Sequence, residues 1–115
     1  MSQVSIYHNP RCSKSRQTLQ LIREAGVEPE IIEYLKNPPT VHELRKILDK
    51  LGLPVKSIIR KGEDIYKNHF KDKDFTQEEW LAKLVEYPKL LERPIVIKED
   101  KAVLGRPPEN VISLL

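Results

Sequence analysis

Residues 4–16 read VSIYHNPRCSKSR, and this stretch carries the first signal of the fold. The β-rich run Val4–Tyr7 predicts a short buried strand that ends at Asn9-Pro10. A helical pattern of apolar residues follows and stops at Gly26. Cys12, the only cysteine among the 115 residues, therefore stands where the first strand becomes the first helix.

Three further strands are indicated by short apolar runs. Residues 30–34 predict the second strand, and a strand, a helix and another strand form a βαβ unit whose crossover implies parallel pairing. Residues 94–97 and 102–104 predict two more strands separated by a charged turn, which favours an antiparallel hairpin. The two prolines at residues 107–108 can begin a last short helix.

Two capping boxes predict helices in the middle of the chain. In each box a threonine is followed three residues later by a glutamate, at residues 40–43 and 76–79. Phe75 and Trp80 are placed around the second box for a hydrophobic staple. The polar residues 61–75 predict a loop or a short helix.

The element order β-α-β, helices, β-β-α is the thioredoxin-like arrangement. We therefore expect an α/β fold with a mixed four-stranded sheet, made of a parallel βαβ unit and an antiparallel hairpin, with flanking helices and a helical insertion. No repeat, low-complexity segment or boundary is visible, so residues 1–115 are expected to form a single domain.

The composition is that of an ordinary globular protein, with 39% hydrophobic and 32% charged residues. The net charge is +3 and most charges alternate in sign, as at residues 71–74, so we expect no nucleic-acid partner. No apolar run approaches the roughly 18 residues of a membrane span, and no secretory signal is apparent. Together with the single cysteine, these features predict a cytoplasmic protein with no membrane partner.

Cys12 has the surroundings of a reactive thiol rather than of a buried structural one. A thiol at the start of a helix faces free N–H groups and the positive end of the helix dipole. Arg11, Lys14 and Arg16 add positive charge around it, and such surroundings lower a cysteine pKa from about 8.5 to roughly 3.5–7.5. His8 either helps to deprotonate the thiol or is a structural histidine at a strand end.

Ser15 stands where a Cys-x-x-Cys motif would have its second cysteine. Any disulfide or adduct on Cys12 must therefore be resolved by a second molecule, and glutathione is the abundant thiol of a reducing cytosol. Ser15 itself either donates a hydrogen bond to the thiolate or to a bound oxyanion, or is an ordinary residue of the first helical turn.

Three arginines stand where the sequence pattern predicts that a helix or strand begins or ends, namely Arg60, Arg93 and Arg106. A guanidinium is always charged and its fork matches an oxyanion, although any one of the three can equally be a surface arginine. Arg93 differs because the Arg93-Pro94 bond leads directly into a predicted strand, and an X-Pro bond entering a strand can be cis. In thioredoxin-like folds that proline lies against the cysteine loop. No spacing of metal ligands and no glycine-rich phosphate loop is present, so we expect no bound metal or cofactor.

These motifs together resemble the ArsC family, the glutaredoxin-coupled arsenate reductases. The resemblance runs in order over nearly the whole chain, through YHNPRCSKSR at 7–16, EYL and NPP within 33–39, IIRK at 58–61, RPIV at 93–96 and GRP at 105–107.

The resemblance implies a role for each matching residue. Cys12 is then the nucleophile that attacks arsenate, His8 favours the thiolate, and Arg60, Arg93 and Arg106 hold the oxyanion. Glutathione attacks the adduct and glutaredoxin removes it, so that arsenite leaves. The expected partners are arsenate, glutathione as co-substrate, and glutaredoxin. Two alternatives stay open: an ArsC-like thiol reductase with another substrate, and a non-enzymatic protein-binding regulator on the same scaffold.

Overall fold

The computed structural model describes residues 3–115, and the chain forms two compact units. The first unit combines the N-terminal part of the chain, up to Asn37, with the C-terminal part from Arg93 to Leu115. The second unit, Pro38–Glu92, is inserted between them. The insertion is helical, as predicted, and the single domain over residues 1–115 stays a prediction.

The first unit is built on a four-stranded sheet with the strand order β2-β1-β3-β4. Its strands are β1 (Val4–Tyr7), β2 (Glu30–Ile32), β3 (Ile95–Lys98) and β4 (Lys101–Leu104). Strand β1 pairs in parallel with β2 and antiparallel with β3, and β3 pairs antiparallel with β4. The predicted mixed sheet is therefore confirmed.

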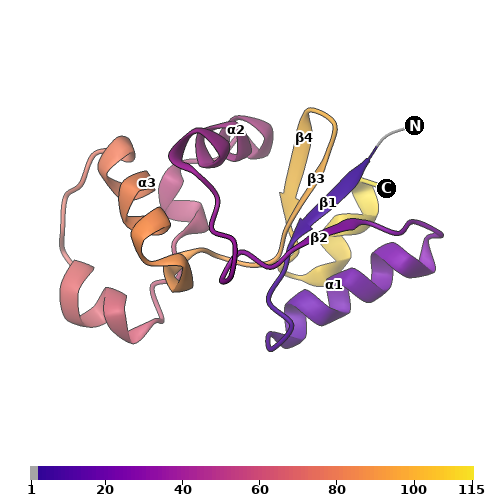
Figure 1. The fold of residues 1–115 in the computed structure, drawn as a ribbon, viewed down its shortest axis with the longest axis horizontal. Coiled ribbons are helices and arrows are strands. Elements are labelled where there is room, and N and C mark those ends of the chain that lie inside the picture. Colours follow the sequence, from indigo (N-terminus) through magenta and orange to yellow (C-terminus); the bar gives the residue numbers. More distant parts are fainter. Residues whose placement is uncertain (1–2) are drawn as a thin grey trace. The chain divides into compact units, whose positions relative to one another are not determined.

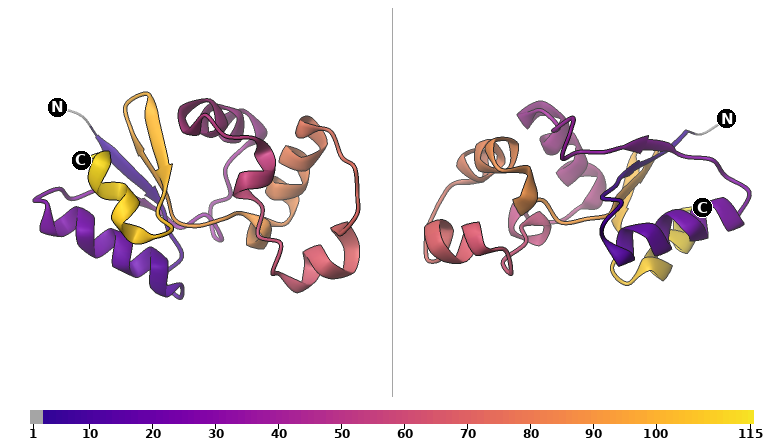
Figure 2. Two further views of the ribbon diagram at one scale, coloured as in Figure 1. Left: turned by 180° about the vertical axis from the view of Figure 1, so that it is seen from behind. Right: turned by 60° about the horizontal axis from the view of Figure 1, so that its bottom comes forward.

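Two helices cover one face of this sheet. Helix α1 (Ser13–Glu24) and the 3₁₀ helix η4 (Pro108–Ser113) pack against each other and lie on the same side of the strands (Figures 1 and 2). The core between helices and sheet consists of Val4, Ile6, Leu19, Ile22, Val96 and Val111. Leu19 and Ile22 are three residues apart in α1, so they share the buried face of the helix. This packing fixes the N-terminal end of α1, which carries Cys12, relative to the sheet.

The second unit is made of helices and short helical turns. They are α2 (Val41–Leu51), η1 (Val55–Ile58), the π-helical turn η2 (Tyr66–Phe70), α3 (Gln77–Glu86) and η3 (Pro88–Leu90). Both predicted capping boxes are present, with Thr40 and Thr76 as the N-caps. The rings of Phe75 and Trp80 lie 4.9 Å apart, so the predicted staple also forms.

The predicted second strand is shorter than the sequence pattern indicates. It ends at Ile32 rather than at residue 34, because the carbonyl of Glu33 accepts hydrogen bonds from the N–H groups of Lys36 and Asn37 and so begins a turn. Over residues 3–115, no helix is both long and apolar enough to cross a membrane.

Candidate active site

The loop between β1 and α1 is organised by Asn9, which is buried. Its backbone carbonyl accepts from the N–H of Cys12 at 3.0 Å, and its side-chain Oδ1 accepts from the N–H of Arg11 at 3.0 Å. An asparagine that bonds the backbone two residues ahead closes an Asx turn. Sequence reasoning assigned no role to Asn9, although the Asn-Pro pair is the signal that marks such a turn.

Cys12 is the N-cap residue of α1, with an extended backbone and a partly exposed side chain. Within the described residues its sulfur makes no regular capping hydrogen bond. The backbone N–H groups of Ser15 and Lys14 nevertheless act on the sulfur, because both belong to the first turn of the helix. Cys12 thus stands at the helix terminus that sequence reasoning predicted.

Two arginines from the C-terminal part of the chain also reach the sulfur. The guanidinium of Arg93 interacts with Cys12. The Nη1 of Arg106 lies 3.9 Å from the Sγ of Cys12 and donates a hydrogen bond to the carbonyl of Arg93 at 3.1 Å. The structure therefore brings Cys12, Arg93 and Arg106 together, while their predicted hold on an oxyanion stays a prediction.

The surroundings of Cys12 lower its pKa below the ordinary value of a thiol. Burial, the largest single effect, raises the pKa of Cys12. The N–H of Ser15, the guanidinium of Arg93 and the N–H of Lys14 lower it, and their combined effect is greater. The result is a thiol that ionises more readily than a free cysteine, as a nucleophile requires.

His8 and Ser15 form a buried pair beside this loop. The Nδ1 of His8 lies 2.6 Å from the Oγ of Ser15, and the same Oγ accepts from the N–H of Asn9 at 3.1 Å. The hydroxyl of Ser15 is thus engaged by these two residues, and it is the backbone N–H of Ser15 that acts on Cys12. The predicted hydrogen bond from the Ser15 hydroxyl to an oxyanion stays a prediction.

The surroundings of His8 lower the pKa of its imidazole below the ordinary 6.5. Burial lowers the pKa of His8, the carboxylate of Glu33 raises it, and the guanidinium groups of Arg23 and Arg16 lower it further. Among the described residues, the imidazole has no hydrogen bond to Cys12. The catalytic role of His8 stays a prediction.

Gly105 allows the chain to pass close to the site just before Arg106. A Cβ at Gly105 would lie 2.6 Å from the Cγ of Pro94 and 2.6 Å from the Oγ1 of Thr18. The N–H of Gly105 donates to the carbonyl of Pro94 at 2.9 Å. The Arg93-Pro94 bond is cis, as the sequence allowed, and the Arg106-Pro107 bond is cis as well.

Arg60 belongs to the second unit and has two acidic partners there. Its Nε lies 3.2 Å from Glu63 and its Nη1 lies 2.9 Å from Glu92. The pairing with Glu92 follows from an isolated bridge between Ile59 and Leu91, which brings the two short segments side by side. The role of Arg60 in holding an oxyanion stays a prediction.

The fold and the site define a thioredoxin-like protein whose chemistry centres on one readily ionised thiol beside two guanidinium groups. The sequence profile of the ArsC family matches residues 7–114. The chain therefore belongs to the ArsC family.

Individual relatives match over nearly the full length of the chain. The protein named arsenate reductase of Haemophilus influenzae is 45% identical over 114 residues, which cover 97% of this chain and 98% of that protein. The uncharacterized protein YfgD of Escherichia coli K12 is 47% identical over 115 residues, or 98% of this chain and 97% of its own. The solved arsenate reductase from Vibrio cholerae is 43% identical, with a TM-score of 0.94 and 98% of each chain covered.

Proposed function

We propose that this protein reduces arsenate to arsenite through a Cys12 thiolate adduct that is resolved by glutathione and glutaredoxin. The observation that carries the proposal is the meeting of Arg93 and Arg106 at the sulfur of Cys12. Relatives at 42–45% identity that are named arsenate reductase support the substrate. The cytoplasm, where glutathione is abundant, is the proposed location.

The two arginines address the main electrostatic difficulty of the reaction. Arsenate is an anion, and its approach to a thiolate costs on the order of 4 kcal/mol per pair of unit charges at about 4 Å and an effective dielectric near 20. Guanidinium groups beside the sulfur offset this repulsion. Their forks also stabilise the negative charge on the oxygen atoms bound to arsenic. The contacts of Arg93 and Arg106 with the sulfur of Cys12 support this proposed role.

The proposed reaction uses the thiols of Cys12, glutathione and glutaredoxin in turn. The thiolate of Cys12 attacks arsenic, an S–As bond forms, and one oxygen leaves as water or hydroxide. The sulfur of glutathione then binds arsenic and a second oxygen leaves as water or hydroxide. The glutaredoxin thiolate attacks the glutathione sulfur, forming a mixed disulfide, and the As–S bond to glutathione breaks with its electron pair left on arsenic. Water then breaks the Cys12–arsenic bond and restores the thiolate, and a second glutathione reduces the mixed disulfide. Over the cycle two glutathione thiols are oxidised to a disulfide, and these two electrons reduce arsenic(V) to arsenic(III), which leaves as arsenite.

The absence of a second cysteine supports the external supply of thiols. Cys12 is the only cysteine in the sequence, and position 15 is a serine. The hydroxyl of Ser15 bonds His8 and Asn9. An intramolecular disulfide is therefore impossible, and the adduct on Cys12 must be attacked by another molecule.

The test is a coupled assay on the purified protein. Arsenate, glutathione, glutaredoxin, glutathione reductase and NADPH are supplied, and NADPH oxidation and arsenite are measured together. Wild type is expected to turn over, Cys12→Ser to be inactive, and Arg45→Gln, an exposed change in the second unit, to match wild type. Absence of arsenite with the wild-type protein would reject the proposal. Turnover of a glutathione mixed disulfide in place of arsenate would indicate a thiol reductase with another substrate.

A further inference from the structure

A pocket of about 590 Å³ lies beside α1 in the first unit. Within residues 3–115, the side chains that line this pocket do not include Cys12, Arg93 or Arg106. Pockets that bind small molecules have volumes of roughly 300–1,000 Å³. The pocket is therefore large enough for a small ligand and is separate from the sulfur of the proposed reaction.

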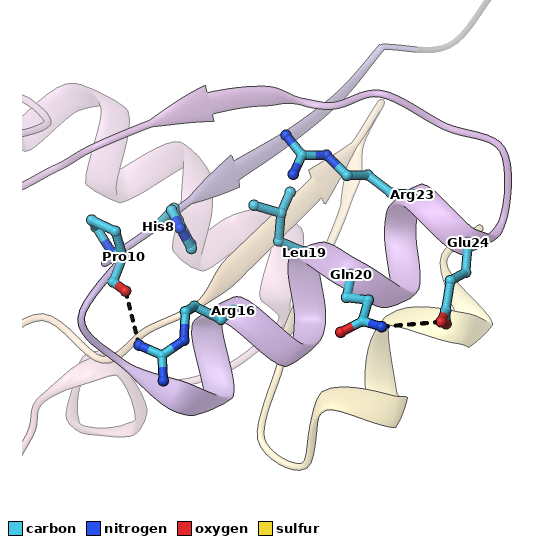
Figure 3. A pocket seen from close by; sticks show the side chains of 7 residues that line it. All are labelled: His8, Pro10, Arg16, Leu19, Gln20, Arg23 and Glu24. Carbon is cyan, nitrogen blue, oxygen red and sulfur yellow. Dashed lines mark hydrogen bonds between the residues drawn. The ribbon is translucent and has the colours of Figure 1, made fainter.

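The pocket is formed where the loop after β1 meets one face of α1 (Figure 3). His8 comes from the loop. Arg16, Gln20 and Arg23 come from the helix, at spacings of four and three residues that put them on one face. Figure 3 shows the two arginine side chains on either side of Leu19, with the ring of His8 at the loop end of the pocket near Pro10.

Both arginines act electrostatically on His8, because each lowers the pKa of its imidazole. The Nη1 of Arg16 donates to the carbonyl of Pro10 at 2.9 Å, which uses one of its five N–H donors. Arg23 pairs with Glu28 through two hydrogen bonds of 3.0 Å, and both side chains are largely exposed. An exposed ion pair of this kind is weak and can exchange partners.

Besides the two arginines, the imidazole of His8 is a polar group that lines the pocket. Its Nδ1 is taken by the hydroxyl of Ser15, whereas its Nε2 has no hydrogen-bond partner among the described residues. His8 as a whole is 6% exposed, but its Nε2 is not among the fully buried side-chain atoms of residues 3–115 that lack a hydrogen bond, so this nitrogen keeps contact with solvent. A ring nitrogen that lines a pocket and has no protein partner is a place where a ligand group can bond.

The pocket also has an acidic side. Glu24 lies at its rim, where its carboxylate accepts from Gln20 at 3.3 Å (Figure 3). The negative charge of Glu24 disfavours a ligand that carries only negative charge. A ligand with a carboxylate at one end and an ammonium group at the other complements both sides of the pocket.

We propose that this pocket binds a small molecule with a carboxylate and an ammonium group, such as an amino acid or a short peptide. The carboxylate lies between Arg16 and Arg23 beside His8, and the ammonium group is directed toward Glu24. The position of the site goes beyond the proposed function, and the peptide-thiol form of the proposal rests on the glutathione dependence proposed above, whereas the amino-acid form does not. Two sources share this chemistry, a peptide thiol and a free amino acid.

Binding of the ligand changes the electrostatic surroundings of His8, which lies in the loop that precedes Cys12. A carboxylate beside His8 raises the pKa of its imidazole, in the same direction as Glu33 and against Arg16 and Arg23. His8 bonds Ser15, whose N–H acts on Cys12. Nuclear magnetic resonance of the imidazole of His8 in the intact protein is therefore a direct reporter of occupancy.

The test titrates the intact protein with S-methylglutathione, whose thiol is blocked, and separately with glutamate. Either ligand is expected to shift the ring signals of His8 and to raise the pKa of its imidazole. Arg23→Gln and Arg16→Gln should weaken binding about tenfold, which is the effect of losing one charge-assisted hydrogen bond. Arg45→Gln is the matched control, since Arg45 makes the same exposed two-bond pair with Glu78 in the second unit.

Each outcome bears on the proposal. A response to S-methylglutathione that depends on Arg16 and Arg23 supports a peptide thiol as the ligand, and the same response to glutamate alone supports a free amino acid. The proposal is overturned if neither compound shifts the His8 signals at millimolar concentration. It is equally overturned if the shift survives both arginine replacements, because the ligand would then bind elsewhere.

Discussion

The Nη1 of Arg106 lies 3.9 Å from the Sγ of Cys12, although the two residues are 94 positions apart in the chain. The same nitrogen donates to the carbonyl of Arg93 at 3.1 Å. Arg106 therefore links the helix terminus that carries the thiol to the segment that carries the second arginine.

The alkylation of Cys12 tests the ionisation of the thiol. Because Arg93 and the N–H of Ser15 lower the pKa of Cys12, the rate of reaction with iodoacetamide should reach half its maximum at a lower pH than in the unfolded chain. The unfolded protein is the matched control, since Cys12 is its only thiol. Arg93→Gln should move the midpoint to higher pH. Equal midpoints in the folded and unfolded states would contradict this assignment.

Arg93→Lys tests whether geometry matters in addition to charge. A lysine keeps the positive charge but loses the planar fork that holds two oxygen atoms at once. We expect arsenate turnover at low substrate concentration to fall about tenfold, the equivalent of roughly 1.4 kcal/mol of binding. Steady-state kinetics over a range of arsenate concentrations measures the effect. Arg45→Lys in the second unit is the control, and unchanged kinetics for Arg93→Lys would remove Arg93 from the oxyanion site.

Gly105→Ala tests the close packing that precedes Arg106. The added methyl group would lie 2.6 Å from Pro94 and from Thr18, so the neighbours must move. Overpacking of this kind costs about 1–3 kcal/mol of unfolding free energy. Chemical denaturation should show the loss, whereas Gly62→Ala should not, because a Cβ at Gly62 meets nothing within 4 Å. Equal stability of the two variants would show that the loop yields freely.

The pH dependence of stability tests the burial of His8. Burial and the nearby arginines lower the pKa of His8 in the folded protein from its ordinary 6.5. Below pH 6.5 the unfolded chain binds a proton that the folded protein does not, so stability falls as the pH falls toward the folded pKa. His8→Asn should reduce this slope in denaturation curves recorded at several pH values. A wild-type slope in that variant would show that other groups cause it.

Local signals in the sequence predicted the elements well. The capping boxes at Thr40 and Thr76 and the staple of Phe75 with Trp80 form as expected, because each involves residues within five positions of one another. The extent of β2 was wrong by two residues, since the hydrogen bonds that begin a turn at Glu33 compete with the strand. The pattern of apolar residues in the sequence carries no information about such hydrogen bonds.

The contacts of the site were harder to predict than its residues. The position of Cys12 at a helix terminus follows from the strand-to-helix pattern alone. The pairing of the Ser15 hydroxyl with His8 depends on the direction of two buried side chains. The pairing of Arg60 with Glu92 depends on a bridge between segments 32 residues apart. Three-dimensional packing settles both contacts, and neither has a local signature.

Arg93 and Arg106 flank the two ends of one hairpin, which is formed by β3 and β4. Arg93 stands two residues before β3, Arg106 stands two residues after β4, and the register pairs Ile95 with Leu104 between them. The positions at which the two arginines leave the backbone are thus related through the pairing of β3 with β4. Exchanging residues 93–106 as one piece would therefore replace both guanidinium groups together with the strand pairing between them.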